Sequence, residues 1–242
     1  MIFNLKVSAN FRVGSALPTI DEHCIDLWTL AKSLRDIGFP LDEWHPPANT
    51  LEQSLRNPAF TDAGPSTAAL AMAKADRDNH DSDLRNLGVW NGKDNNGGGA
   101  IYTVMHCTGA IPSHLHFRCE EVKSLRDYRN VIKLIQGIVM LWKPMLVQIA
   151  HAEYDSVFPD RPGAGWMLYL PFKIDSQQVP EAAQIITIMD DAGKKQFGTL
   201  IVTVEETFDM ENEEHVKRAN AIETRLVDQD LLPTNAEFVE KF

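Results

Sequence analysis

Hydrophobic and polar residues alternate at the start of the chain, and this period of two is typical of a β-strand with one buried face. From Phe3 to Val13 every odd position is apolar and every even position from Asn4 to Arg12 is polar. Other short apolar runs predict further strands. They cover residues 101–105, 115–119, 146–150, 165–170, 185–189 and 198–204. The sequence therefore predicts a protein rich in β-structure.

Three long segments carry apolar residues at the spacing of an amphipathic helix. They begin after Thr19, near Ser124 and Asp127, and at about Glu213. Thr19 and Glu22 have the spacing of a capping box, which predicts the start of the first helix. The second segment is almost continuously apolar up to residue 142, so we expect it to be central and buried.

Between these segments the sequence predicts a hairpin and several irregular stretches. The glycine-rich turn at 91–99 separates Val89 and Trp90 from the next strand, which is a hairpin pattern. Residues 45–65 are rich in proline and aperiodic, while residues 67–74 are rich in alanine and predict a short helix. This order favours the α+β class, with a mixed, largely antiparallel sheet or sheets and packed helices.

The 242 residues fit one domain that spans residues 1–242, or two subdomains divided near residues 85–120. Asp and Glu outnumber Lys and Arg by 34 to 23, which gives a formal charge of −11. This balance argues against nucleic-acid binding, because phosphate contacts need clustered cations. It allows a basic protein partner, although an acidic surface also serves solubility alone.

The cysteine count and the apolar runs indicate the compartment. Three cysteines, at positions 24, 107 and 119, fit free thiols in a reducing environment. No signal-peptide pattern is visible at the start, and the apolar stretch at 134–142 is far shorter than the ~20 residues of a membrane span. We therefore expect a cytoplasmic protein with no membrane partner.

The densest group of metal-ligand residue types is His106, Cys107, His114, His116 and Cys119. Zinc needs about four such side chains that converge. If 115–119 is a strand, His114 and His116 point to one face and Cys119 to the other. The pattern therefore predicts no metal site.

Glu121 and Lys123 form a Glu-x-Lys pair, which with an upstream Asp can hold Mg²⁺ in restriction-endonuclease-like enzymes. The pair is too short to specify a nuclease by itself. Residues 97–99 lack the Lys-Ser/Thr of a P-loop, and the chain has no Gly-x-Ser-x-Gly elbow or His-Glu-x-x-His motif. We predict no catalytic residue and no cofactor, with a metal-dependent nuclease or small-molecule hydrolase as the alternative.

Several short segments, in this order along the chain, resemble the immunity protein 52 family of polymorphic-toxin systems. They are residues 41–44 (LDEW), 89–92 (VWNG), 142–144 (WKP), 165–170 (GWMLYL), 198–204 (GTLIVTV), 208–212 (FDMEN), 215–216 (HV) and 231–233 (LLP). The resemblance implies a cytosolic, non-enzymatic antidote encoded beside a toxin that bacteria deliver to competitors, often through a type VI secretion system. It also implies that the toxin is a nuclease of the restriction-endonuclease fold.

The resemblance provides no contact residues, so charge guides their prediction. A nuclease presents a positive cleft to its substrate, and a cluster of carboxylates on an exposed loop can occupy that cleft or steer association toward it. The predicted partner-binding residues are Asp76, Asp78, Asp81, Asp83 and Asp94. The alternative is that residues 76–83 form only a solvated tip. We expect Trp142 and Trp166 to be buried anchors of the fold.

Overall fold

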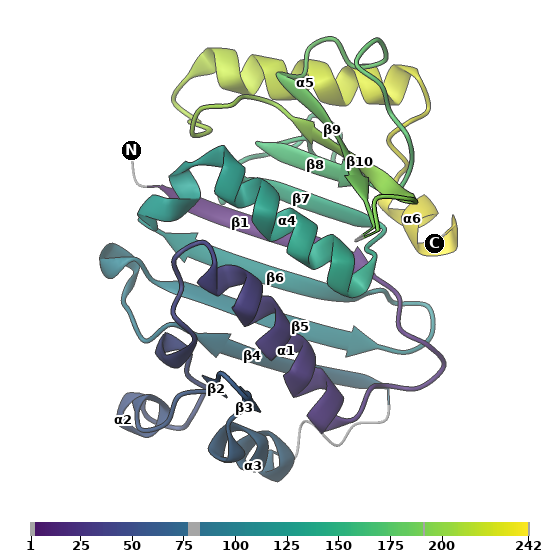
Figure 1. Cartoon of the computed structure of the whole chain (residues 1–242). Helices are drawn as coiled ribbons and strands as arrows, with labels where there is room; N and C mark the ends of the chain where they lie inside the picture. Colours follow the sequence, from purple (N-terminus) through teal and green to yellow (C-terminus); the bar gives the residue numbers. More distant parts are fainter. Residues whose placement is uncertain (1–2, 77–82, 191, 242) are drawn as a thin grey trace.

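The strand predicted at the start of the chain is β1 (Asn4–Phe11), and it lies inside an eight-stranded sheet (Figure 1). The computed structural model describes residues 3–76, 83–190 and 192–241. The strand order is β4-β5-β6-β1-β7-β8-β10-β9, and every neighbouring pair is antiparallel. The other strands are β4 (Leu84–Trp90), β5 (Ala100–Cys107), β6 (Ser113–Glu120), β7 (Leu146–His151), β8 (Met167–Leu170), β9 (Gln184–Met189) and β10 (Gln196–Val202).

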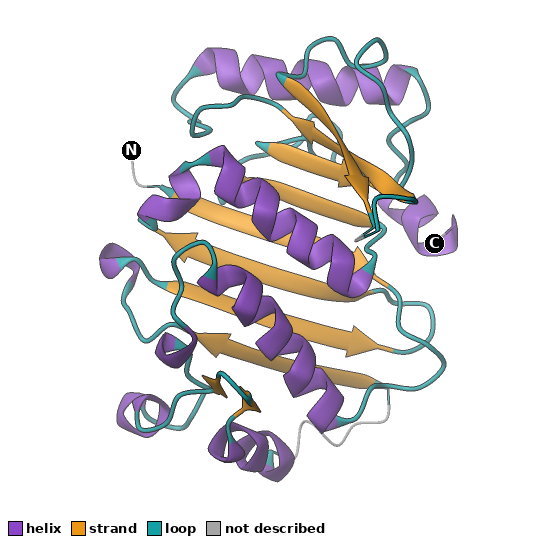
Figure 2. Ribbon diagram, in the orientation of Figure 1, coloured by secondary structure: helices purple, strands orange, loops and turns teal. Residues whose placement is uncertain are grey.

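Three long helices match the three amphipathic segments (Figure 2). They are α1 (Ile20–Arg35), α4 (Tyr128–Trp142) and α5 (Glu213–Asp228). Shorter elements are α2 (Leu51–Leu55), α3 (Thr67–Ala75), α6 (Asn235–Lys241), the two-stranded ribbon of β2 (Phe60–Thr61) and β3 (Gly64–Pro65), and the 3₁₀ turns η1 (Leu41–Glu43), η3 (Asn95–Gly97) and η4 (Lys123–Arg126). The predicted α+β class with a largely antiparallel sheet is confirmed.

α1 and α4 lie side by side on one face of the sheet, and α5 lies on the opposite face (Figure 1). Leu5 and Val7 of β1 point toward α1 and α4 and join the larger core cluster. Leu168 of β8 and Ile201 of β10 point the other way and pack with Ile222 of α5. The strands between α4 and α5 are therefore buried on both faces, which explains why β8 is continuously apolar.

The capping box at the start of α1 is formed as predicted. The Thr19 hydroxyl accepts from the Glu22 backbone N–H at 3.2 Å, and the Glu22 carboxylate accepts from the Thr19 backbone N–H at 2.7 Å. These two bonds satisfy N–H groups that a helix start otherwise leaves without a partner.

We expect Thr19→Ala to lower the free energy of unfolding by about 1 kcal/mol, because it removes this cap. Chemical denaturation measures the loss, and Glu22→Gln, which keeps an acceptor for the Thr19 N–H, should lose less. A larger loss for Glu22→Gln than for Thr19→Ala would show that the carboxylate charge, and not the hydroxyl cap, is the main stabilising group at this end.

Two expectations about α4 were wrong in detail. Ser124 lies in η4, and the helix begins at Tyr128 because the Asp127 carboxylate caps it by accepting from the Arg129 backbone N–H at 3.0 Å. Trp142, expected to be buried, is only partly buried at the end of the helix. Trp166 is fully buried, as expected.

The stretch 45–65, described above as irregular, contains α2 and the β2-β3 ribbon. These elements follow Trp44, which is fully buried against Phe39 and Tyr102. No helix in the described ranges is long and apolar enough to cross a membrane. The division near residues 85–120 stays a prediction, and this segment supplies three adjacent strands of the single large sheet.

Candidate functional site

In the part of the chain that the structure describes, no helix covers the β4-β5-β6-β1 half of the sheet on the face opposite α1 and α4. Twelve of its outward residues form three cross-strand rows of four on β4, β5, β6 and β1, and the pair Asn4 and Glu120 continues the same face at one end. We call these twelve residues the open face. The rows are Trp90-Ile101-Arg118-Lys6, Gly88-Thr103-His116-Ser8 and Asn86-Met105-His114-Asn10. Every one of them is exposed or half-buried, whereas the residues between them on the same strands face the core.

The open face ends at β7, the neighbour of β1 in the sheet, and beyond it α5 covers this side of the sheet. The row that contains His116 and Ser8 continues through Gln148 to Leu168, which is buried under α5. Gln148 Nε2 donates to the Gly163 carbonyl at 2.9 Å, which ties the loop between β7 and β8 to β7. The open and covered parts of this face therefore belong to one continuous surface of strands.

The Glu223 carboxylate of α5 fixes the loop at this border. It is fully buried and accepts from the backbone N–H groups of Val157 at 2.7 Å and Ala164 at 2.8 Å, and from the Tyr154 hydroxyl. Burial raises the pKa of Glu223, and these hydrogen bonds oppose the shift. These hydrogen bonds therefore fix the position of the loop between β7 and β8 at the border of the open face.

The charges on the open face are all positive. Lys6 and Arg118 are neighbours across β1 and β6, and both are exposed. None of the twelve residues is an Asp or Glu. Burial lowers the pKa of His116, and His114, Lys6 and Arg118 lower it further. The two imidazole rings lie 4.9 Å apart in an edge-to-face arrangement, and the lowered pKa of each keeps them neutral at pH 7.

A shallow hollow of about 330 Å³ marks one end of the open face. Ile101 and Arg118 line it, together with Trp90 and Lys93. Glu120 is on its rim and accepts a 3.4 Å hydrogen bond from the Asn4 side chain. This carboxylate bounds the positive surface at that end.

The predicted facing of the His and Cys cluster is confirmed. His114 and His116 lie on the open face, while Cys119 and His106 point into the core. Cys24, Cys107 and Cys119 are buried free thiols, as expected. Among the described residues, no three His, Cys, Asp or Glu side chains lie close enough together to hold a metal ion.

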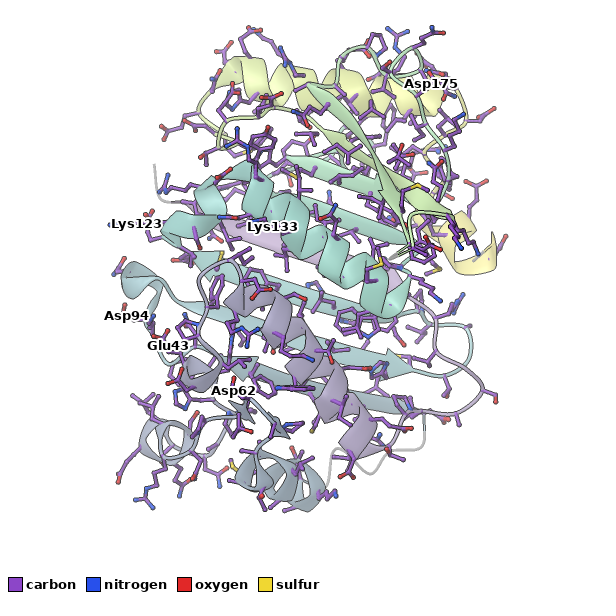
Figure 3. All side chains as sticks on the ribbon, viewed as in Figure 1. Glu43, Asp62, Asp94, Lys123, Lys133 and Asp175 are labelled. Atoms are coloured by element: carbon purple, nitrogen blue, oxygen red, sulfur yellow. The ribbon has the colours of Figure 1, made fainter. Side chains whose placement is uncertain are left out.

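The Glu121 carboxylate, half of the Glu-x-Lys pair, is occupied by structural contacts. It accepts from the Phe3 backbone N–H at 2.6 Å and from the Arg126 guanidinium at 2.9 Å. These contacts lower the pKa of Glu121. Lys123 is exposed on η4 (Figure 3). The carboxylate thus ties the start of the chain to η4.

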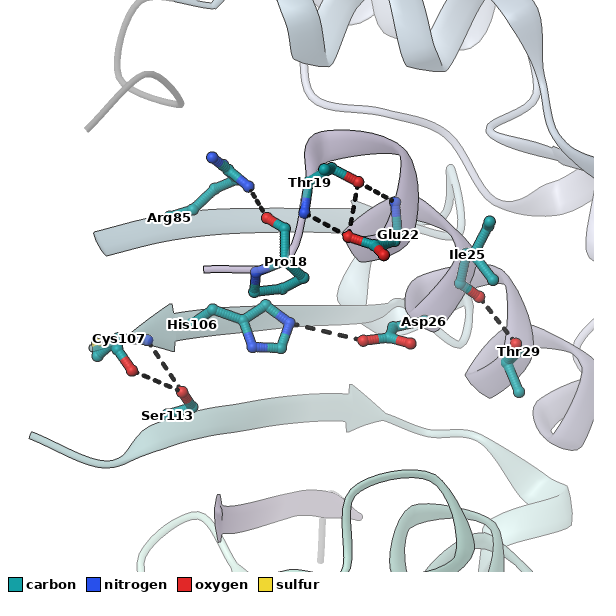
Figure 4. Close-up of polar contacts among 10 residues, drawn as sticks. All are labelled: Pro18, Thr19, Glu22, Ile25, Asp26, Thr29, Arg85, His106, Cys107 and Ser113. Carbon is teal, nitrogen blue, oxygen red and sulfur yellow. Dashed lines mark hydrogen bonds and ion pairs between the residues drawn. The ribbon is translucent and has the colours of Figure 1, made fainter. Parts of the chain in front are cut away.

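His23 and His106 are buried between α1 and β5, and the half-buried Asp26 lies beside His106 (Figure 4). His106 Nε2 lies 3.7 Å from the Asp26 carboxylate, and the His106 ring packs edge-to-face on His23 at 4.2 Å between centroids. Burial lowers the pKa of His23 to about 2 and that of His106 to about 4, so both rings are neutral at pH 7. His23 and His106 are almost completely inaccessible, which leaves no room for a substrate.

The structure places the predicted aspartates at different sites. Asp76 and Asp83 are exposed at the end of α3 and the start of β4, while Asp94 follows β4 at its other end (Figure 3). Asp94 Oδ1 accepts from the Gly97 backbone N–H at 2.6 Å and stabilises the β4–β5 turn. Asp78 and Asp81 lie outside the described residues. Asp94 therefore does not share a site with Asp83, and the binding role of these aspartates stays a prediction.

Sequence reasoning did not select Lys6, Ile101 or Arg118 as binding candidates. The alternation along β1, β5 and β6 places Lys6, Ile101 and Arg118 on the faces of their strands that point away from the core. This alternation does not indicate which strands α5 covers. That depends on the strand order, which brings residues 84–120 beside β1.

Comparison with known proteins agrees with this architecture. The structure of "Pseudomonas aeruginosa T6SS protein PA0821" is similar, with a TM-score of 0.52 and 12% sequence identity over 92% of this chain and 73% of that chain. At this identity the likeness shows the fold alone. No curated protein sequence matches the chain. The family model for immunity protein 52 matches residues 19–235, nearly the whole chain. The chain belongs to the immunity protein 52 family.

Proposed function

We propose that this protein is a non-enzymatic immunity protein that binds and neutralises a cognate toxin in the cytoplasm. The observation that carries this proposal is the family match over residues 19–235. The fold shared with a T6SS protein supports delivery of the toxin by a type VI secretion system. The toxin is a nuclease of the restriction-endonuclease fold, as the family resemblance implies.

The described residues support binding rather than catalysis. The Glu121 carboxylate is held by Phe3 and Arg126, and the neutral pair His23 and His106 is sealed in the core. An enzyme needs such groups at an accessible site where a substrate can reach them. The open face instead offers a broad surface without a deep cleft.

The test is co-expression with the toxin polypeptide encoded by the adjacent gene. We expect cells that produce the active toxin to survive only when this protein is present. We also expect the two purified proteins to elute together in size-exclusion chromatography. Toxin killing that this protein does not prevent would contradict the proposal.

The enzymatic alternative is tested on the same preparation. We expect no DNA cleavage in the presence of Mg²⁺ and no stoichiometric metal by elemental analysis. Cleavage that Glu121→Ala abolishes would identify a nuclease instead.

A further inference from the structure

We propose that the open face is the surface that holds the toxin and that it fits an acidic, partly apolar patch on that partner. This inference rests on the proposed function and adds to it the binding surface and the charge of the surface bound. It commits to a protein partner.

The first argument is charge complementarity. The chain carries a formal charge of −11, yet the open face contains two cations and no carboxylate. Within the described ranges, no ion pair involves Lys6 or Arg118. Glu120 at the rim accepts a hydrogen bond from Asn4 and forms no ion pair with Arg118 within the described ranges. Two adjacent exposed cations outside any such ion pair favour a partner that supplies carboxylates.

The second argument is the apolar content between the charges. Ile101 is 47% exposed and adjoins Arg118 and Trp90 in the same row. Met105 is half-buried beside His114. Arg, Trp and Met are enriched in protein interfaces, where a central apolar group is surrounded by polar residues. This mixture matches a protein surface better than a purely solvated face.

The third argument is rigidity. The twelve side chains stand on four hydrogen-bonded strands whose other face packs into the main core through Val7, Tyr102 and Phe117. Side chains on such a support lose little backbone freedom when a partner binds.

A nucleic acid is a weaker candidate for this face. Lys6 and Arg118 can neutralise only two phosphates, and the net negative charge of the chain opposes a polyanion. The exposed Ile101 also has no role in phosphate contacts.

The decisive variant is Lys6→Glu/Arg118→Glu. Its matched control is Lys123→Glu/Lys133→Glu, which makes the same change in net charge at exposed lysines of η4 and α4 (Figure 3). The probe is a catalytically inactivated form of the toxin polypeptide encoded by the adjacent gene. Binding is measured by biolayer interferometry at low and high salt, after circular dichroism shows the same fold for both variants.

We expect the open-face variant to lose at least about 30-fold in affinity and the control to stay within about threefold of wild type. The association rate of the open-face variant should fall, with a flatter salt dependence. Lys6→Arg/Arg118→Lys keeps both charges and should bind within several-fold of wild type.

The outcomes separate this inference from the proposed function. If the wild type does not bind the toxin, the proposed function fails and the inference fails with it. If the wild type binds and the open-face variant binds equally well, the function stands and the open face is not the interface. Reversal of the four aspartates at 76, 78, 81 and 83 is the competing arm, and a loss there alone would transfer the interface to that segment. Wild-type binding of a labelled DNA duplex that only the open-face variant loses, with toxin binding unchanged, would assign the face to nucleic acid.

Discussion

Replacing Trp166 with Ala is expected to lower the free energy of unfolding by about 3–5 kcal/mol. The indole is fully buried, and its Nε1 donates to the Val204 carbonyl at 2.9 Å. The ring also packs edge-to-face on Phe3, with centroids 6.5 Å apart. Truncation therefore creates a cavity and leaves a buried carbonyl without its donor. Urea denaturation followed by far-ultraviolet circular dichroism measures the loss.

Trp142→Ala is the matched control, because Trp142 is only partly buried and stacks on Phe11 at 5.2 Å. We expect a smaller loss of folding free energy, since the half-buried Trp142 removes less apolar surface from water on folding than Trp166 does. If Trp166→Ala keeps the wild-type stability but no longer neutralises the toxin, Trp166 belongs to the interface and not to the core.

Acidification from pH 6.5 to 4.5 is expected to destabilise the protein through His23 and His106. Burial lowers the pKa of both imidazoles in the folded state, to about 2 and about 4, below the value near 6.5 of an unfolded chain. As the pH falls below 6.5, the unfolded state binds protons that the folded state excludes. The stability is therefore fully present above pH 6.5 and falls by up to about 1.4 kcal/mol per pH unit for each histidine. Below pH 4 only His23 continues to contribute.

The measurement is the urea midpoint and slope at a series of pH values. His23→Gln/His106→Gln removes both titrating groups, so we expect a flatter pH dependence whatever its absolute stability. His114→Gln/His116→Gln is the comparison variant, because these half-buried rings on the open face also have a lowered pKa. We expect it to flatten the pH dependence less than the substitution of the two buried rings does. A wild-type stability that stays constant from pH 6.5 to 4.5 would show that the buried rings become protonated in the folded protein.

The elements predicted best are those whose local signals are strong. β1 follows the alternation from Phe3, α1 begins at the Thr19 capping box, and α5 spans Glu213–Asp228 as expected. In each case neighbouring residues carry the pattern, so short-range physics is sufficient.

The short elements were missed because they are not stable by local pattern. α2 has five residues, and β2 and β3 have two each, too few for a periodic signal. Tertiary contacts hold this segment: the Ser54 hydroxyl donates to the Pro46 carbonyl at 2.6 Å and accepts from the Trp90 indole at 2.8 Å. α6 was missed in the same way, and its Phe238 is buried in the cluster that also contains Leu226 of α5.

The sequence by itself determined which residues share a face within each strand, because side chains alternate with a period of two. It therefore placed His114 and His116 on one face of their strand and Cys119 on the other. In the same way it placed Lys6 and Val7 on opposite faces of β1. Only the tertiary structure decided that Lys6, Ile101 and Arg118 meet in one row, since antiparallel pairing sets the register between distant segments. It also decided that α5 covers Leu168 and leaves His116 open, because helix placement depends on the order of all eight strands.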